Sequence, residues 1–207
     1  MSPTTSRVPQ EERTRAMRLR LLEATVEMLV DRGWSGTSTT LVSQRAGVSR
    51  GAQLHHFPTK NALVLAAVEH LSDVRGRELA EAATHLPAGR RRTRAVLEML
   101  ADHFTSPVFT AALELWVAAR TDPQLLAAVA PLEQRIGRDV HRLTVDLLGA
   151  DEKQPGAREL VQATLDLVRG LGLANTISDD TTRRSRILDE WARTLDLRLH
   201  GTAKESS

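Results

Sequence analysis

Apolar residues recur at helical intervals along almost the whole chain. Between positions 11 and 32, Met17, Leu21 and Met28 are separated by four and seven residues, which places them on one face of a helix. The same spacing, with polar caps and prolines at the boundaries, predicts further helices at about 38–46, 50–56, 59–84, 91–104, 107–120, 123–148, 157–173 and 182–200. Pro131 lies inside one of these segments and is expected to kink that helix or split it in two. Strand patterns are nearly absent, so the sequence predicts an all-α fold of about nine helices.

Stop signals divide these helices into a small first domain and a larger second one. Residues 1–10 are expected to form a flexible basic arm, and residues 11–60 a three-helix domain that ends near Pro58 and Thr59. Residues 61–200 are expected to form the larger helical domain, followed by a disordered tail at 201–207. A chain of 207 residues is long enough for this arrangement.

The first domain contains the pattern of a helix-turn-helix. Two short helices, preceded by a longer one, are joined by Gly47, Val48 and Ser49. Glycine permits the positive φ of a tight turn, Val48 fills the crevice between the helices, and Ser49 caps the second helix. In this motif the second helix places its N-terminal residues in the major groove of DNA, while the first crosses the phosphate backbone. Residues 49–56 are therefore the segment expected to contact bases.

The charge distribution favours an anionic partner at the same end of the chain. Residues 1–60 hold nine Lys and Arg against five Asp and Glu, whereas residues 61–207 hold 19 against 21. The arginine run Arg90–Arg94 lies far along the chain from residues 38–60, and we interpret it as a solvated helix start.

The absence of cysteine excludes disulfides and thiolate chemistry and is consistent with a reducing compartment. No apolar run approaches the roughly 20 residues needed to span a bilayer. We therefore expect a cytoplasmic protein with no membrane partner.

The first domain also resembles a known family over about 55 residues, without a gap. The agreement is with the DNA-binding domain of the TetR family of bacterial transcriptional regulators, and it is carried by Gly33-Trp34, Thr37-Ser38-Thr39, Val42, Ala46-Gly47-Val48-Ser49, Gly51, His56-Phe57, Lys60 and Leu63. The resemblance implies a homodimer whose N-terminal domains bind double-stranded operator DNA. It also implies a helical C-terminal domain that dimerises and binds a small-molecule effector, which in most members releases a repressor from DNA.

The resemblance further implies roles for individual residues. Thr39 and Lys60 would hold phosphates, Arg50, Ala52 and His55 would face bases, and His56 would lie at the backbone. The side-chain chemistry agrees, because Arg can donate two hydrogen bonds to guanine and Ala can contact a thymine methyl group. The full set of residues expected at the DNA is Ser38, Thr39, Thr40, Ser49, Arg50, Gly51, Ala52, Gln53, Leu54, His55, His56 and Lys60.

The chain departs from the family at Gln53 and Leu54, where an aliphatic or aromatic residue is usually followed by tyrosine. Two alternatives follow. Either Leu54 takes part of the buried role through a small rotation of the helix, or Gln53 is buried and hydrogen-bonded. If Gln53 instead faces the groove, its amide can pair with adenine.

For the second domain, the resemblance places the effector pocket among the middle helices and the dimer interface on the last two. The candidate pocket residues are Phe104, Leu113, Trp116 and His141, and the candidate interface residues are Leu165, Val168, Leu188, Trp191 and Leu195. Among the other polar residues near apolar stripes are His103 and Glu114, which would orient a ligand or simply be satisfied. Gly170 and Gly172 interrupt an apolar helix, and we interpret them as points of close helix approach.

No catalytic or metal-binding pattern competes with this interpretation. His55 and His56 are adjacent on a helix and point about 100° apart, so they cannot readily share one ion. Nucleophile-elbow, phosphate-loop and dinucleotide-binding motifs are absent from the sequence. We therefore expect neither an enzyme nor a cofactor. The alternative hypothesis is a helical ligand-binding or protein-interaction module without sequence-specific DNA binding.

Overall fold

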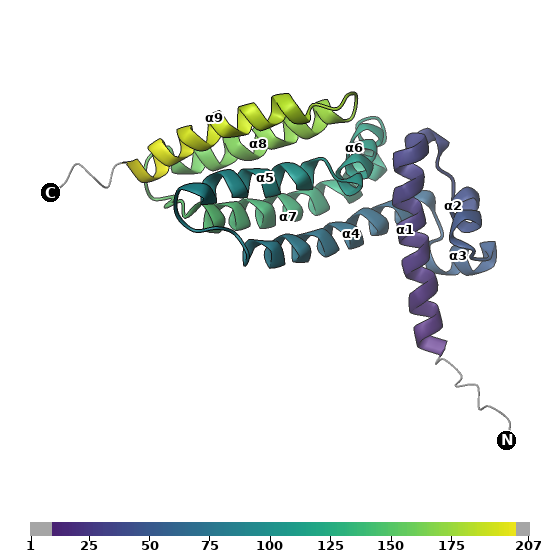
Figure 1. Ribbon diagram of the computed structural model, residues 1–207. Helices are drawn as coiled ribbons and strands as arrows, with labels where there is room; N and C mark the ends of the chain where they lie inside the picture. Colours follow the sequence, from purple (N-terminus) through teal and green to yellow (C-terminus); the bar gives the residue numbers. More distant parts are fainter. Residues whose placement is uncertain (1–9, 202–207) are drawn as a thin grey trace, which may run out of the picture. The chain divides into compact units, whose positions relative to one another are not determined.

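The computed structural model describes residues 10–201, apart from the side chains of Arg90 and His200. Within this range nine α-helices and one short 3-10 helix follow one another with no strand, which confirms the predicted all-α fold (Figure 1). The expected arm and tail fall almost entirely on residues 1–9 and 202–207, outside the described residues. The elements are α1 (Gln10–Gly36), α2 (Thr39–Ala46), α3 (Arg50–His56), α4 (Lys60–Ala83), η1 (Gly89–Arg91), α5 (Arg92–Phe104), α6 (Pro107–Ala119), α7 (Pro123–Leu148), α8 (Ala157–Asn175) and α9 (Thr181–His200).

The chain divides into two compact units. The first unit takes in the chain up to Leu71 together with Ala111–Val129, and the second takes in Ser72–Thr110 and the chain from Ala130 onward. Helices α4, α6 and α7 therefore each contribute residues to both units.

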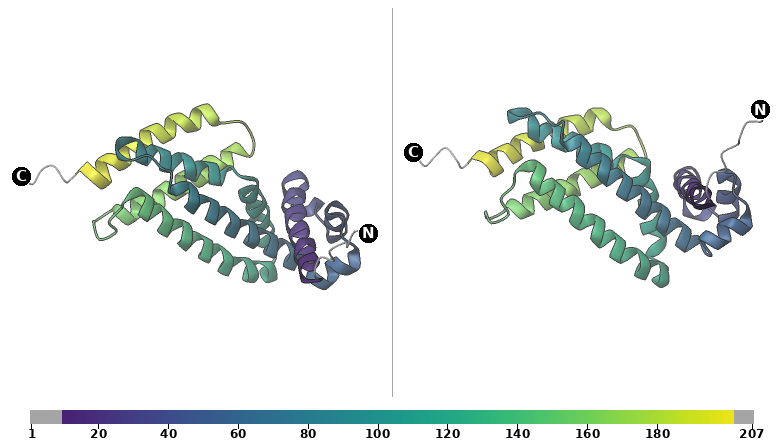
Figure 2. Two further views of the ribbon diagram at one scale, coloured as in Figure 1. Left: turned by 60° about the horizontal axis from the view of Figure 1, so that its bottom comes forward. Right: turned by 90° about the horizontal axis from the view of Figure 1, so that it is seen from below.

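The first unit is built on the apolar stripe of α1. Leu21 and Leu22 are fully buried, and α1 packs against α2, as two views of the ribbon show (Figure 2). The regular part of α1 ends at Gly33, whose φ of 64° and ψ of −177° are not helical. Glycine adopts this conformation at little cost, so the helix stops where the sequence predicted.

The second unit is centred on α5, which packs against both α8 and α9. Its core includes Leu97 and Leu100 of α5, both fully buried. A Cβ atom added at Gly172 of α8 would stand 2.2 Å from the carbonyl oxygen of Phe104 at the end of α5, so these two helices approach closely there. A Cβ atom added at Gly170, by contrast, would meet no atom of the described part of the chain within 4 Å. The expected close approach is therefore found at Gly172 and not at Gly170.

Helix α7 runs unbroken through Pro131, so of the two alternatives of a kink or a split, the split is excluded. Proline removes one backbone donor, but the surrounding turns keep their helical path. None of the helices among residues 10–201 combines the length and apolar character needed to cross a membrane.

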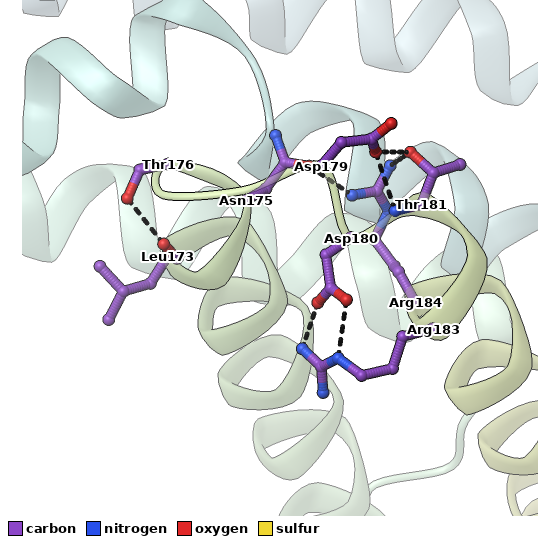
Figure 3. Close-up of polar contacts among 8 residues, drawn as sticks. All are labelled: Leu173, Asn175, Thr176, Asp179, Asp180, Thr181, Arg183 and Arg184. Atoms are coloured by element: carbon purple, nitrogen blue, oxygen red, sulfur yellow. Dashed lines mark hydrogen bonds and ion pairs between the residues drawn. The ribbon is translucent and has the colours of Figure 1, made fainter.

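Polar side chains fix the connection between α8 and α9 (Figure 3). Arg183 Nε donates to Asp180 Oδ1 at 2.7 Å, and a second nitrogen of the same guanidinium contacts the other carboxylate oxygen. Arg184 Nη1 reaches back from α9 to Asn175 Oδ1 of α8 at 2.9 Å. The hydrogen bond from Arg184 to Asn175, nine residues apart, therefore joins α9 to α8 across their connection.

Candidate nucleic-acid interface

Helices α2 and α3 are joined by a tight turn with a side-chain cap on each helix. Ser38 has an extended backbone (φ −135°), and its Oγ accepts a hydrogen bond from the Leu41 N–H at 3.2 Å. Gly47 ends α2 in the left-handed conformation, at φ 61°. Ser49 Oγ then accepts from the Ala52 N–H at 3.2 Å and starts α3. The valine between the two caps is buried, so the turn has the geometry that the sequence predicts.

Contacts to α1 hold both helices in place. Phe57, which follows α3, is 5% exposed, and the guanidinium carbon of Arg18 lies 5.3 Å from its ring centroid. Arg45 of α2 forms ion pairs with Glu27 (2.8 Å) and Asp31 (3.1 Å) of α1. These pairs are exposed and contribute little to stability. The buried ring of Phe57 and the packing of α3 against α2, which α1 in turn supports, therefore hold α3 in place.

The outer face of α3 is open to solvent. The guanidinium of Arg50 lies near the start of α2, because Nη1 is 3.4 Å from Thr40 Oγ1. This long contact leaves most of its donors available. The predicted residues that are exposed are Thr40, Ser49, Arg50, Gly51, Leu54 and His55, and those that are half-buried are Ser38, Thr39, Ala52, His56 and Lys60.

Gln53 is fully buried, which decides between the alternatives left open by the sequence. Its Nε2 donates to the carbonyl oxygen of Phe57 at 2.5 Å, while its Oε1 is buried without a hydrogen-bond partner among the described residues. Leu54 is 44% exposed and takes no buried role. A side chain with no exposed surface cannot reach a base edge, so the expectation that Gln53 contacts DNA is wrong in this conformation.

Lys60, expected to hold a phosphate, has a partner within the protein. Its Nζ donates to the carbonyl oxygen of Trp34 at 2.5 Å and lies 4.1 Å from the centroid of the Trp34 ring. Burial lowers the pKa of this ammonium group. Because an ammonium has three donors, the contact to Trp34 leaves two for other acceptors. In the sequence, Trp34 is only one of the residues that carry the family resemblance, and no contact is predicted for it.

Glu114 of α6 contacts the backbone of Trp34 from its N–H side. Its Oε2 accepts a hydrogen bond from the Trp34 N–H at 2.7 Å. A Cβ atom at Gly33 would stand 3.0 Å from this oxygen, so glycine leaves the space that the carboxylate needs. Glu114 is thus a satisfied side chain of the first unit. Sequence reasoning missed this contact because 80 residues separate the two partners.

The arginine run at the start of α5 is engaged in structural contacts. Arg92 Nε donates to the carbonyl oxygen of Leu147 at 3.1 Å. Arg94 pairs with Asp189 (2.6 Å) and Glu98 (3.1 Å). The side chains of these two arginines therefore support the second unit.

The four candidate pocket residues fall in different places. Phe104 is buried in the second unit, with its ring 5.3 Å from that of Phe109. His141 lies on a hollow between α7 and α8, where it contacts Glu152. Leu113 and Trp116 are half-buried on the part of α6 that belongs to the first unit.

The predicted dimer interface needs correction. Four of its five residues are at most 4% exposed within a single copy of the chain, namely Leu165, Val168, Leu188 and Leu195. Trp191 is half-buried and donates its indole N–H to Thr164 Oγ1 at 2.9 Å. Apolar periodicity identified the buried faces of α8 and α9, but these faces pack inside the chain and are not available to a second copy.

The capped turn, the supporting α1 and the open face of α3 define a helix-turn-helix DNA-binding protein. A family model described as "Bacterial regulatory proteins, tetR family" matches residues 21–67. The HTH-type transcriptional regulator CymR of Pseudomonas putida is 31% identical over 189 residues, which cover 90% of this chain and 92% of that protein. The chain therefore belongs to the TetR family of bacterial transcriptional regulators.

Further relatives and solved structures agree with this assignment. The HTH-type transcriptional regulator BetI of Pseudomonas aeruginosa is 28% identical over 167 residues, covering 79% of this chain and 83% of that protein. A transcriptional regulator from Rhodococcus sp. Rha1 shares the fold with a TM-score of 0.69 at 24% identity, over 87% of this chain and 96% of that one. FadR from Bacillus subtilis, solved with stearoyl-CoA, has a TM-score of 0.65 at 13% identity, over 88% and 98% of the two chains. These relatives are named as transcriptional regulators and not as enzymes.

Proposed function

We propose that the protein is a homodimeric repressor that binds a palindromic operator and leaves it when a small molecule enters the second unit. The observation that carries the proposal is the outer face of α3, where Arg50 and His55 stand in solvent on a helix whose inner face is locked by Gln53 and Phe57. A rigid helix with exposed N-terminal side chains is the form in which this motif reads the major groove.

Individual roles on the DNA follow from exposure and chemistry. Arg50 pairs with guanine O6 and N7, Ala52 contacts a thymine methyl group, and His55 reaches a neighbouring base edge. Thr39 and Thr40, at the N-terminus of α2, hold phosphate with their hydroxyl and amide groups. His56 and the two remaining donors of Lys60 add backbone contacts. The hydroxyls of the two capping serines, Ser38 and Ser49, remain available as donors to phosphate oxygens.

The dimer is formed through the outward faces of α8 and α9. Three large apolar residues on or next to these helices are exposed: Leu173 (50%), Ile177 (89%) and Leu197 (70%). Burying apolar surface of this kind favours association. Two copies then present two α3 helices to successive major grooves about 34 Å apart.

The effector site is a hollow of about 380 Å³ between α4, α5 and α7 of the second unit. Apolar side chains such as Leu79, Ile136 and Leu143 line it, together with His103. Burial lowers the pKa of His103 to about 4, so the imidazole is neutral at pH 7. Its Nδ1 is buried and has no hydrogen-bond partner among residues 10–201. Because Asp73, Arg77 and Asp139 also line the hollow, the arrangement suits an amphipathic molecule with an apolar part and a polar group.

Helix α4 offers a route from this hollow to the DNA. Its second half, Ser72–Ala83, lines the hollow, and its first half, Lys60–Leu71, belongs to the first unit. A ligand that shifts α4 changes the separation of the two reading helices. A coupling of about 1–3 kcal/mol lowers operator affinity roughly 5- to 150-fold.

Selection of DNA sequences with the purified protein tests the proposal. The expected result is a palindromic consensus with half-sites about one helical turn apart. Arg50→Ala is expected to weaken binding to it by about 1–3 kcal/mol per half-site. Arg91→Ala removes an exposed arginine of the second unit and is the matched control, with unchanged affinity. A protein that binds all duplexes equally at low salt would contradict the proposal and favour a helical binding module without sequence reading.

A further inference from the structure

A second hollow in the second unit gathers arginine side chains. It lies between α7 and α8, next to the connection that joins them, and has a volume of about 500 Å³. Four guanidinium groups line it, from Arg138 and Arg142 on α7 and from Arg158 and Arg169 on α8. Its size falls within the usual range for small-molecule sites. The effector hollow around His103 shares none of these residues.

Only part of this positive charge is neutralised within the protein. Arg158 pairs with Glu152 at 3.1 Å, and Arg169 pairs with Asp166 at 2.9 Å. The guanidinium groups of Arg138 and Arg142 form no hydrogen bond or ion pair with any residue that the structure describes. They stand four positions apart on one helix face, where like charges repel each other. The hollow therefore holds two guanidinium groups that an anion would neutralise.

The single carboxylate among the lining residues is already committed. Glu152 Oε1 lies 2.9 Å from His141 Nε2, and the hydrogen bond from His141 is the main reason why the pKa of Glu152 is lowered. Gln162 Nε2 lies 2.7 Å from His141 Nδ1 and donates to it, so Nε2 carries the proton that reaches Glu152. Together with the pair to Arg158, these contacts fix Glu152 in the wall of the hollow.

The floor of the hollow is apolar and has room for a ligand. Val145 and Leu165 contribute side chains to it, and a Cβ atom at Gly137 would meet no heavy atom of the described residues within 4 Å. The guanidinium of Arg169 also lies 5.6 Å from the ring centroid of Phe104, which orients this arginine. A ligand can thus rest an apolar part on the floor while its charged group meets the arginines.

From this geometry we propose that the hollow binds a phosphorylated small molecule with at least two negative charges. Guanidinium groups pair with phosphate oxygens through two parallel hydrogen bonds, so Arg138 and Arg142 each match one phosphate edge. A nucleoside diphosphate fits this description, with its phosphates on the arginines and its organic part on Val145 and Leu165. The site goes beyond operator binding and effector release and does not depend on either.

Isothermal titration of the full-length protein with inorganic phosphate, pyrophosphate and ADP at low salt tests the proposal. ADP and pyrophosphate are expected to bind more tightly than phosphate, because they carry more charge and more oxygens. The double variant Arg138→Gln/Arg142→Gln is expected to weaken both by at least roughly tenfold. Arg198→Gln, an exposed arginine of α9 outside the hollow, is the matched control and should bind like the wild type.

A second variant distinguishes a built site from a diffuse positive surface. Gly137→Met keeps every charge but fills the hollow, so it is expected to reduce ADP affinity by a similar factor. ADP binding unchanged in Gly137→Met, or no heat with pyrophosphate, would overturn the proposal. So would arginine variants that lose affinity for mixed-sequence duplex DNA alone, because the arginines would then form a nucleic-acid surface. Circular dichroism confirms that each variant is folded.

Discussion

Replacing Gly172 by alanine is expected to destabilise the second unit, although alanine normally stabilises a helix. The new Cβ atom would lie 2.2 Å from the carbonyl oxygen of Phe104, whereas an ordinary contact begins at 3.4 Å. The two helices must therefore move apart by about 1 Å, and backbone atoms cannot yield as a flexible side chain would. Overpacking of this kind costs about 1–3 kcal/mol, against a gain of about 0.5–1 kcal/mol from removing a helical glycine. With backbone on the opposing side, we expect a net loss of about 2 kcal/mol.

Gly170 provides the matched control on the same helix. A Cβ atom there meets open space in the described part of the chain, so Gly170→Ala is expected to raise stability by about 0.5–1 kcal/mol. Gly170 lies on α8, whose outward face is part of the proposed dimer surface, so its substitution could also change dimerisation. Gly137→Ala on α7, where a Cβ atom likewise meets open space in the described part of the chain, is therefore a second control.

Thermal unfolding at one fixed protein concentration compares the variants. For a chain of this size, the expected loss lowers the Tm of Gly172→Ala by about 4–8 °C. If Gly172→Ala unfolded at the same temperature as Gly170→Ala or above it, the close approach of α5 and α8 would be disproved.

Three further outcomes are expected. Gln53→Leu removes the buried and unpartnered Oε1 but also the hydrogen bond that Nε2 donates to the Phe57 carbonyl oxygen, so the two effects should offset each other and change stability by less than about 1 kcal/mol in urea unfolding, with operator binding retained; a loss of about 3 kcal/mol or more would contradict this balance. Glu114→Ala should accelerate hydrogen exchange of the Trp34 amide, and exchange at the wild-type rate would show that the Glu114 contact does not protect it. His103 has its pKa lowered to about 4 by burial, so the unfolded chain binds an additional proton between pH 6.5 and 4, and folding stability should fall as the pH drops through this window, by up to about 3 kcal/mol. His103→Phe should remove this part of the pH dependence, and an identical pH profile in the variant would refute the assignment.

The helix boundaries were predictable because the signals that set them are local. Ser38 and Ser49 each cap a helix through a hydrogen bond to a residue three positions away, and Gly47 ends α2 with its own backbone conformation. Such contacts need no knowledge of the rest of the chain. The three-helix motif and most of its exposed candidate residues follow from them.

The contacts that the sequence did not predict join distant parts of the chain. Glu114 and Trp34 are 80 residues apart, and Gly170 and Gly172 differ only in whether another helix lies opposite. The predicted dimer residues, such as Leu165, failed for the same reason. Periodicity indicates which face of a helix is apolar, but it does not indicate whether that face meets its own chain or a second copy.

Burial of Gln53 and exposure of Arg50, Leu54 and His55 separate two selective pressures on one short helix. Residues that turn inward are constrained by packing, whereas those that turn outward carry no such constraint and, under the proposed function, answer only to the DNA. Substitutions at exposed positions usually change stability by less than about 0.5 kcal/mol. A combinatorial library at the three outward positions therefore samples new operators on an unchanged scaffold, and regulators of this kind can diverge in their target promoters without first having to regain their fold.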